Sequence, residues 1–144
     1  NKIASILGLN RTWNVALVGV GNLGSALASY KEFQNQGFHI KLLFDSDPQK
    51  IGTSLRGIPI LELKNLTSHL KQNQIELVII TVPGASAQQV TDEVIKSGIK
   101  AILNFAPATL KVPQDVFLRN ESMAIELEYL SFCLSNKNAR VKND

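Results

Sequence analysis

The chain has 144 residues, of which 44% are hydrophobic, and its 15 basic and 12 acidic residues give a formal charge of +3. This length suits one domain with one core, and the mild charge argues against the concentrated basic stripe on which nucleic-acid binding usually depends. No apolar run reaches the roughly 18 residues of a membrane span, no signal peptide opens the sequence, and the single Cys133 cannot form an internal disulfide, so we expect a soluble, cytoplasmic protein with no membrane partner.

The first twelve residues precede the first predicted strand. Asn1 stands where an initiator Met is expected, so we expect the chain to begin inside a longer protein. The stretch "NKIASILGLNRT" spaces its apolar residues as a short helix does and then reaches a glycine, which is typical of a helix end. We interpret residues 1–12 as the remnant of a junction to a preceding domain.

Strands and helices then alternate along the chain. Apolar runs predict strands at 13–20, 38–45, 57–61, 75–84, 99–107 and 115–119. Helical spacing predicts helices at 22–35, 63–73 and 86–98, the last with Ser86 as its cap, and a final amphipathic helix from 121 to about 135. Residues 136–144 lack an apolar period and are expected to fray. This alternation predicts an α/β fold with a doubly wound, mostly parallel Rossmann-type sheet over residues 13–120.

A glycine motif joins the first strand to the first helix. The pattern Gly-x-Gly-x-x-Gly is weak evidence alone, but here it follows a buried strand and opens a helix. The first glycine serves a tight turn, the second lets the backbone approach a pyrophosphate, and the third lets the helix pack close to the sheet. We therefore predict a dinucleotide-binding turn formed by Gly19, Val20, Gly21, Asn22, Leu23 and Gly24.

A carboxylate ends the second strand. Asp45 follows Gly24 by 21 positions, where an acceptor commonly takes the ribose hydroxyls of a dinucleotide. A carboxylate would repel a 2′-phosphate, and the following Ser46 supplies no compensating arginine, so NADH and NAD⁺ are favoured over their phosphorylated forms. Lys50 lies nearby in sequence, where a solvated charge explains it equally well.

Two later strands end in "TVPG" and "NFAP", which should meet at the carboxyl edge of a parallel sheet. We interpret both as walls of the nicotinamide half of the site. Asn104 either bonds a carboxamide or caps a loop. Val82, Pro83 and Pro107 either contact the cofactor or only end their strands.

No proton donor or acceptor is visible for a hydride-transfer site, and neither histidine maps to this edge. A dehydrogenase needs one, yet His39 falls in a predicted strand and His69 in a polar helix. The residues therefore favour a binding domain and not an enzyme. Two alternatives stay open, namely the cofactor half of an NAD-dependent dehydrogenase and a CoA-binding domain of the acyl-CoA ligase type, although Asp45 disfavours the phosphorylated ribose of CoA.

Four motifs in order, "ALVGVGNLGSAL", "FDSDPQKIG", "NFAPATLKVP" and "ELEYLSF", resemble the Rex family of redox-sensing transcriptional repressors. The resemblance covers roughly residues 9–135. It implies a Rossmann domain that senses the NADH/NAD⁺ ratio, a homodimer formed by exchange of the C-terminal helix at 121–135, and a flexible tail at 136–144. It also implies that operator DNA is bound only through an N-terminal winged-helix domain absent from this chain.

The resemblance also implies roles for single residues. Asn104 and Pro107 would lie at the nicotinamide end. Tyr30, which helical spacing alone would place in the core, would join an intersubunit network that responds to the redox state of the cofactor. Ser122 takes the position of its partner, an Asp in the family, so the charge of that contact is absent here. Met123 would reach the nicotinamide pocket of the second subunit.

Overall fold

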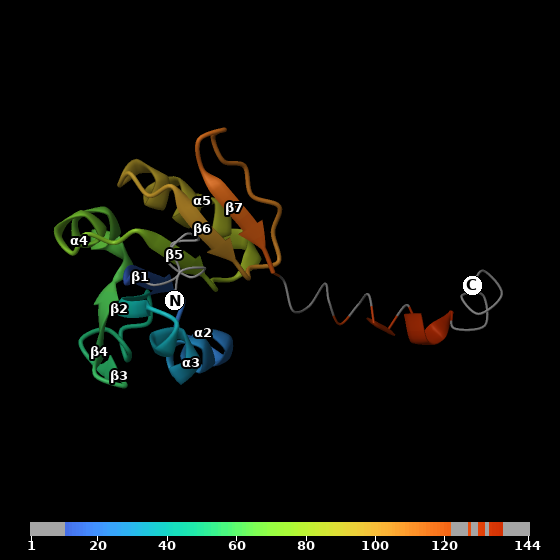
Figure 1. The fold of residues 1–144 in the computed structure, drawn as a ribbon, viewed down its shortest axis with the longest axis horizontal. Coiled ribbons are helices and arrows are strands. Elements are labelled where there is room, and N and C mark those ends of the chain that lie inside the picture. Colours follow the sequence, from blue (N-terminus) through green and yellow to red (C-terminus); the bar gives the residue numbers. More distant parts are fainter. Residues whose placement is uncertain (1–10, 122–126, 128–129, 132, 137–144) are drawn as a thin grey trace.

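One sheet of seven strands organises the residues that the computed structural model describes, which are 11–121, 127, 130–131 and 133–136 (Figure 1). Its order is β3-β4-β2-β1-β5-β6-β7, and all pairs are parallel except β3 with β4. If β3 is set aside, the order of the remaining six strands is that of a dinucleotide-binding sheet. The order in which successive strands are added to the sheet reverses between β1 and β5. The strands are β1 (Trp13–Val18), β2 (Phe38–Asp45), β3 (Ser54–Leu55), β4 (Ile58–Glu62), β5 (Leu77–Ile80), β6 (Ala101–Asn104) and β7 (Phe117–Asn120).

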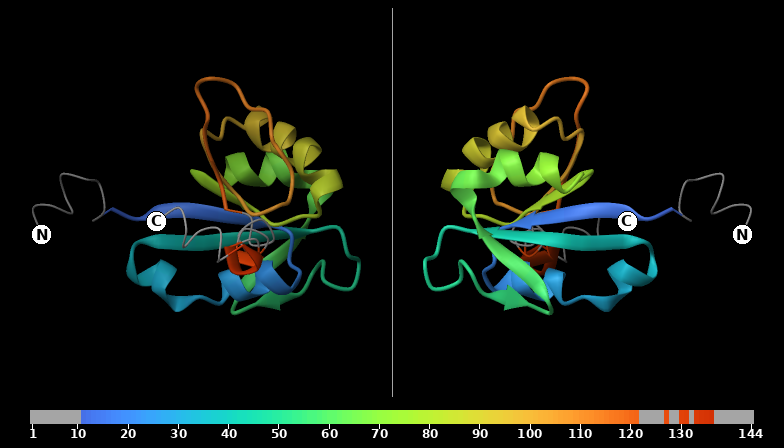
Figure 2. Two further views of the ribbon diagram at one scale, coloured as in Figure 1. Left: turned by 90° about the vertical axis from the view of Figure 1, so that its right-hand side faces the viewer. Right: turned by 90° about the vertical axis from the view of Figure 1, so that its left-hand side faces the viewer.

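Helices cover both faces of this sheet. One face carries α2 (Asn22–Ala28) and α3 (Lys31–Asn35), and the opposite face carries α4 (Leu66–Gln72) and α5 (Gly84–Lys96), as Figure 2 shows. A short 3₁₀ turn, Leu63–Asn65, precedes α4. The predicted α/β class with a doubly wound, mostly parallel sheet is therefore confirmed.

The core has two layers, one on each side of the sheet. Val18 and Phe44 face α4 and α5 together with Leu70, whereas Leu17 and Leu43 belong to the layer beneath α2 and α3. Neighbouring residues of β1 therefore bury opposite faces, and all four from Val15 to Val18 are at most 1% exposed. A strand buried on both sides needs apolar residues at every position, which explains the unbroken run in the sequence.

Two predicted helix boundaries are wrong. The helix expected over 22–35 is interrupted at Ser29 and Tyr30, because Tyr30 takes an extended backbone (φ −77°, ψ 107°) and a new helix begins at Lys31. Its side chain is 55% exposed and packs edge-to-face on Phe33, so the core position that spacing indicated is also wrong. The second correction is at Ser86, which does not cap α5, because that helix already begins at Gly84. In addition, the short strand β3 was not predicted.

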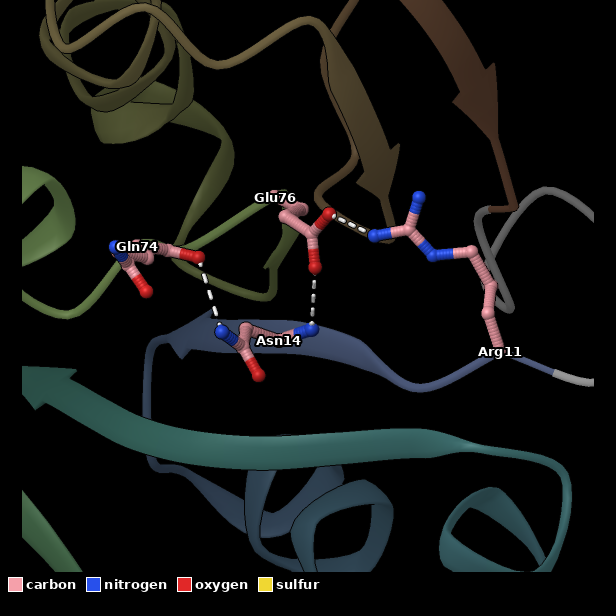
Figure 3. A network of polar contacts seen from close by, with 4 residues as sticks. All are labelled: Arg11, Asn14, Gln74 and Glu76. Carbon is pink, nitrogen blue, oxygen red and sulfur yellow. Dashed lines mark hydrogen bonds and ion pairs between the residues drawn. The ribbon is translucent and has the colours of Figure 1, made fainter.

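A polar network fixes where the chain enters the sheet (Figure 3). Arg11 pairs with the Glu76 carboxylate at 2.5 Å, and the second carboxylate oxygen accepts the Asn14 backbone N–H at 3.0 Å. The Asn14 side chain donates to the Gln74 carbonyl at 3.1 Å, and the Arg11 guanidinium lies 3.7 Å from the ring centre of Trp13. The network lies at the amino end of β1, opposite the strand ends where the glycine turn follows.

Part of the C-terminal helix prediction falls within the described residues. Residues 127, 130–131 and 133–135 are helical, in agreement with a helix reaching about 135. Ser122 and Met123, residues 1–10 of the predicted junction and residues 137–144 of the predicted tail lie outside the described residues. Across the ranges that are described, no helix is long and apolar enough to cross a membrane.

Candidate functional site

A cavity of about 470 Å³ lies at the carboxyl ends of β1, β2 and β5. Its walls include six of the residues predicted from the sequence: Gly19, Val20, Gly21, Asp45, Val82 and Pro83. The remaining walls are Val18, Phe44, Ser46, Lys50, Leu63, Thr81 and Ser86. This is the place where the strand order reverses, and open parallel sheets bind their ligands there.

The glycine turn is held close to the end of β5. Gly19 has φ +105°, and a Cβ there would lie 2.8 Å from the carbonyl carbon and oxygen of Thr81. A Cβ on Gly24 would lie only 1.9 Å from the Gly19 oxygen. Gly21 differs, because nothing in the protein lies within 4 Å of a Cβ added there. Two of the glycines are therefore required by the fold itself, whereas the third keeps space open beside the cavity.

Asp45 is tied into the same turn. One carboxylate oxygen accepts the backbone N–H of Val20 at 2.8 Å, and the other accepts that of Asp47 at 2.8 Å. Each oxygen keeps a second lone pair for a further donor. The half-buried carboxylate is thereby oriented in advance, next to the turn, with acceptor capacity left for two hydroxyl groups.

Two residues that sequence reasoning did not assign to the site also hold the turn. The Lys50 ammonium donates to the Val20 carbonyl at 2.5 Å, and the Thr81 hydroxyl donates to the Gly19 carbonyl at 2.5 Å. From the sequence, Lys50 could equally be a solvated charge on the loop after Asp45. In the structure its side chain is half-buried and lies on the cavity wall. Lys50 and Thr81 lie far from the turn in sequence, so only the folded chain brings these groups together.

The two predicted rim segments do meet. A Cβ on Gly84 would lie 2.8 Å from the Pro107 carbonyl oxygen, so the loop after β6 packs directly on the start of α5. Asn104, however, is fully buried, and its side chain bonds within the protein. Asn104 and Pro107 do not line the cavity described above.

Other candidate residues lie elsewhere. Asn22 is exposed and Leu23 half-buried, both in the first turn of α2. Tyr30 lines a separate cavity of about 330 Å³ together with His39. His69 packs against Phe44 with ring centres 6.1 Å apart, on the face covered by α4. Of the residues that the structure describes, none form a cluster that could hold a metal ion.

Comparison with known proteins adds the family context. The chain matches the family of CoA-binding domains over residues 10–108. It is 47% identical over 137 residues to the redox-sensing transcriptional repressor Rex of Desulfitobacterium hafniense, which covers 95% of this chain and 65% of that protein. The chain thus spans 65% of the length of this curated relative.

Solved structures of one protein, RSP, are similar as well. RSP, a Rex-family repressor, matches with a TM-score of 0.87 and 36% identity over 99% of this chain and 68% of its own. Its complex with β-NADH gives 0.87 and 35% over 100% and 70%. Its complex with β-NAD⁺ and operator DNA gives 0.91 and 36% over 99% and 65%.

Proposed function

The chain belongs to the CoA-binding domain family and, within it, to the Rex family of redox-sensing transcriptional repressors, and from this we propose that it is the domain with which such a repressor binds NADH and NAD⁺ and senses their ratio. One observation carries the proposal: the glycine turn and the oriented Asp45 carboxylate line a single cavity where the strand order reverses. The β-NADH and β-NAD⁺ complexes of RSP support it.

In this proposal the pyrophosphate lies over the open space at Gly21, against the turn from Gly19 to Gly24 that includes Asn22 and Leu23. The ribose hydroxyls of the adenosine half donate to the free lone pairs of Asp45. Adenine lies toward Ser46 and Leu63. The nicotinamide half lies toward Val82 and Pro83, near the loop that contains Pro107.

The same geometry favours NADH over NADPH and over CoA. A 2′-phosphate placed at the ribose would face the Asp45 carboxylate, and CoA carries a phosphorylated ribose as well. The Lys50 ammonium is already engaged by the Val20 carbonyl and is one charge against a doubly charged group. We therefore propose that the dinucleotide without a 2′-phosphate is the ligand.

We further propose that the domain works in a homodimer through its C-terminal helix. An apolar groove of about 190 Å³ opens on the face of the sheet that carries α3. Leu127, Leu130 and Leu134 are 61%, 55% and 74% exposed in the single chain. A second copy whose helix lies in this groove would cover both apolar surfaces. The groove is lined by Val15, Phe33, Gln36, Phe38, Ile40, Leu77, Ile79 and Leu103.

Exchange of this helix would bring Met123 to the nicotinamide pocket of the partner and Ser122 toward Tyr30. Both roles come from the resemblance and stay proposals, as does the flexible tail from 136 to 144. The exposed ring of Tyr30 is available for such a contact. Operator DNA would be bound, in the cytoplasm, by the part of the full-length repressor that lies outside this match.

The dehydrogenase alternative receives no support from the placement of the histidines. Neither His39 nor His69 lines the cavity, and Val82 and Pro83, which are apolar, form the side at which the nicotinamide is proposed to lie. We propose a sensor that binds the cofactor without turning it over.

Calorimetric titration with NADH, NAD⁺, NADPH and CoA in parallel tests the proposal. We expect NADH to bind more tightly than NADPH and CoA. Tighter binding of CoA than of NADH would refute the proposal. Oxidation of NADH with a small carbonyl substrate would instead support the dehydrogenase alternative.

A further inference from the structure

Asn104, the last residue of β6, holds several backbone groups at once. Its side chain is completely buried, and its Oδ1 accepts the Ala106 backbone N–H at 2.9 Å. Its Nδ2 donates to the carbonyls of Ala106 at 3.2 Å and Ala108 at 3.4 Å, and to the side chain of Asn120 at 3.0 Å. Asn104 therefore fixes the loop after β6 from the inside.

That loop and residues 81–84 together make the cofactor rim, in which Val82 and Pro83 line the cavity and the loop packs on the start of α5. Its Phe105 N–H donates to the Ile80 carbonyl at 2.8 Å, at the end of β5. Its Pro107 carbonyl lies where a Cβ on Gly84 would otherwise fit, so it packs on the start of α5 immediately after Val82 and Pro83. A shift in these cavity walls would therefore press on the loop that Asn104 holds.

The same residue also holds the end of β7. Asn104 and Asn120 are register partners in the two strands, and the backbone carbonyl of Asn104 accepts the N–H of Glu121 at 2.7 Å. The side-chain bond between Asn104 and Asn120 is a second link at this point. Glu121 is the first residue after β7, where the C-terminal segment begins.

We propose that Asn104 and Asn120 form a positioning pair that couples the cofactor rim to the start of the C-terminal segment. This rests on the proposed function, because the cofactor is what would move the rim. Asn104 acts through the loop and through Asn120, not by bonding the cofactor. The pair would carry a change at Val82 and Pro83 to Glu121, and from there into the helix proposed to be exchanged.

Asn120 gives the sharper test because it is exposed, so its replacement leaves the core intact. Asn120→Ala removes one of the three acceptors of Asn104 Nδ2, the one that links it to β7, whereas Asn120→Asp keeps an acceptor oxygen at the same place. Arg119→Lys changes the neighbouring exposed residue in the same strand but keeps the positive charge beside the Glu121 carboxylate, and it serves as the matched control. The full 144-residue chain is used throughout, and amide hydrogen exchange is followed residue by residue with and without NADH.

Without cofactor, we expect the amides of Ala106 and Glu121 to exchange about five-fold faster in Asn120→Ala, as the loss of one hydrogen bond would give. With NADH, the parent chain should gain protection both at 81–84 and at 117–121. Asn120→Ala should keep the first gain and lose most of the second. Asn120→Asp and Arg119→Lys should behave as the parent does.

Two outcomes would overturn the coupling while leaving the proposed function standing. One is protection at 81–84 without any at 117–121 in the parent chain, and the other is unchanged protection at 117–121 in Asn120→Ala. No NADH protection at 81–84 would contradict the proposed function itself, and with it the coupling. Protection at 81–84 reports binding and protection at 117–121 reports the coupling, so the two failures are told apart.

Discussion

The open space beside Gly21 makes a substitution that separates binding from folding. A Cβ on this residue would have no protein atom within 4 Å, and its backbone (φ −88°, ψ −156°) is one that alanine adopts without strain. Gly21→Ala should therefore keep the fold, and it should raise stability by roughly 0.4–1 kcal/mol because alanine restricts the unfolded chain. The new methyl group would fill space that the proposal gives to the pyrophosphate.

The loss of affinity can be estimated from the contacts at stake. Displacing the pyrophosphate from the turn removes at least one hydrogen bond to a charged group, which is worth roughly 1.5–3 kcal/mol. NADH should therefore bind about 10- to 150-fold more weakly to Gly21→Ala. Thermal unfolding and a fluorescence titration with NADH on the same sample measure both quantities.

Gly98→Ala is the matched control for this experiment. A Cβ on Gly98 also meets open space, but its φ of +96° strains any side chain, so about 1 kcal/mol of stability should be lost with no change in NADH affinity. Gly98 lies past the end of α5, away from the cavity. A Gly21→Ala protein that is stable and binds NADH as the parent does would refute the placement of the cofactor over the turn.

Four further results are expected. Asp45→Asn should lower the affinity for NADH about ten-fold and reduce the preference for NADH over NADPH, because it removes the negative charge and one acceptor. An unchanged preference for NADH over NADPH in parallel titrations would show that Asp45 is not at the ribose site. Lys50→Met should lower the affinity for NADH about five-fold or more, because the hydrogen bond to the Val20 carbonyl is lost. If titration finds the same NADH affinity as in the parent chain, Lys50 is only a surface charge. Glu76→Ala should lower the free energy of unfolding by about 1–2 kcal/mol in urea, because it removes the ion pair of Arg11 and leaves the Asn14 N–H without its acceptor. Lys100→Ala, which breaks an exposed pair, should change nothing measurable at neutral pH. Light scattering at tens of micromolar should find a dimer that Leu130→Asp converts to monomer, and a monomeric parent chain would contradict helix exchange.

The ion pair of Lys100 and Asp115, which serves as the control for Glu76→Ala, also has a defined pH dependence. The Lys100 ammonium donates a hydrogen bond to Asp115 and lowers the pKa of that carboxyl below its ordinary value of 3.8. Because the folded-state pKa is the lower one, any contribution of the pair is present above the ordinary pKa and is lost as the pH falls through the lowered one. The comparison with Glu76→Ala therefore belongs near neutral pH.

The sequence allowed the fold to be predicted because its strongest signals are local. The buried strands carry apolar residues at every position, as β1 shows from Val15 to Val18, and Gly19 and Gly24 are required by contacts within one strand-turn-helix unit. The break at Tyr30 escaped prediction because the apolar spacing continues through it without proline or glycine. Phe33 then packs along the sheet from a second short helix, a tertiary effect that spacing alone does not reveal.

The site was predicted in part for the same reason. Asp45 could be placed from its distance to the glycines, since a carboxylate ending the second strand of this unit comes back beside the turn. Lys50 and Thr81 could not, because their bonds to the turn depend on how a loop and a distant strand end fold over it. Asn104 was placed at the correct edge, but whether its amide faces a ligand or the protein interior is decided by packing around the loop after β6.

The distribution of charge in the cavity bears on how the two redox states would be told apart. NADH and NAD⁺ share the pyrophosphate and both riboses, so Asp45, Lys50 and the glycine turn would treat them alike. They differ at the nicotinamide ring, which is neutral in NADH and positively charged in NAD⁺. Val82 and Pro83 line the cavity where the ring is proposed to lie, and both are apolar. Moving a cation from water against apolar groups is unfavourable.

The neutral ring should therefore be preferred, and the preference should reside in the rim and not in the adenosine half. Substitutions at Asp45 would then scale both affinities together and leave their ratio intact. Substitutions in the rim, or in the pair that holds it, would change the ratio. The residues proposed to bind the shared parts of the cofactor are thus not those that would make the domain a sensor. The buried amide of Asn104 links the rim to the segment that would report the redox state.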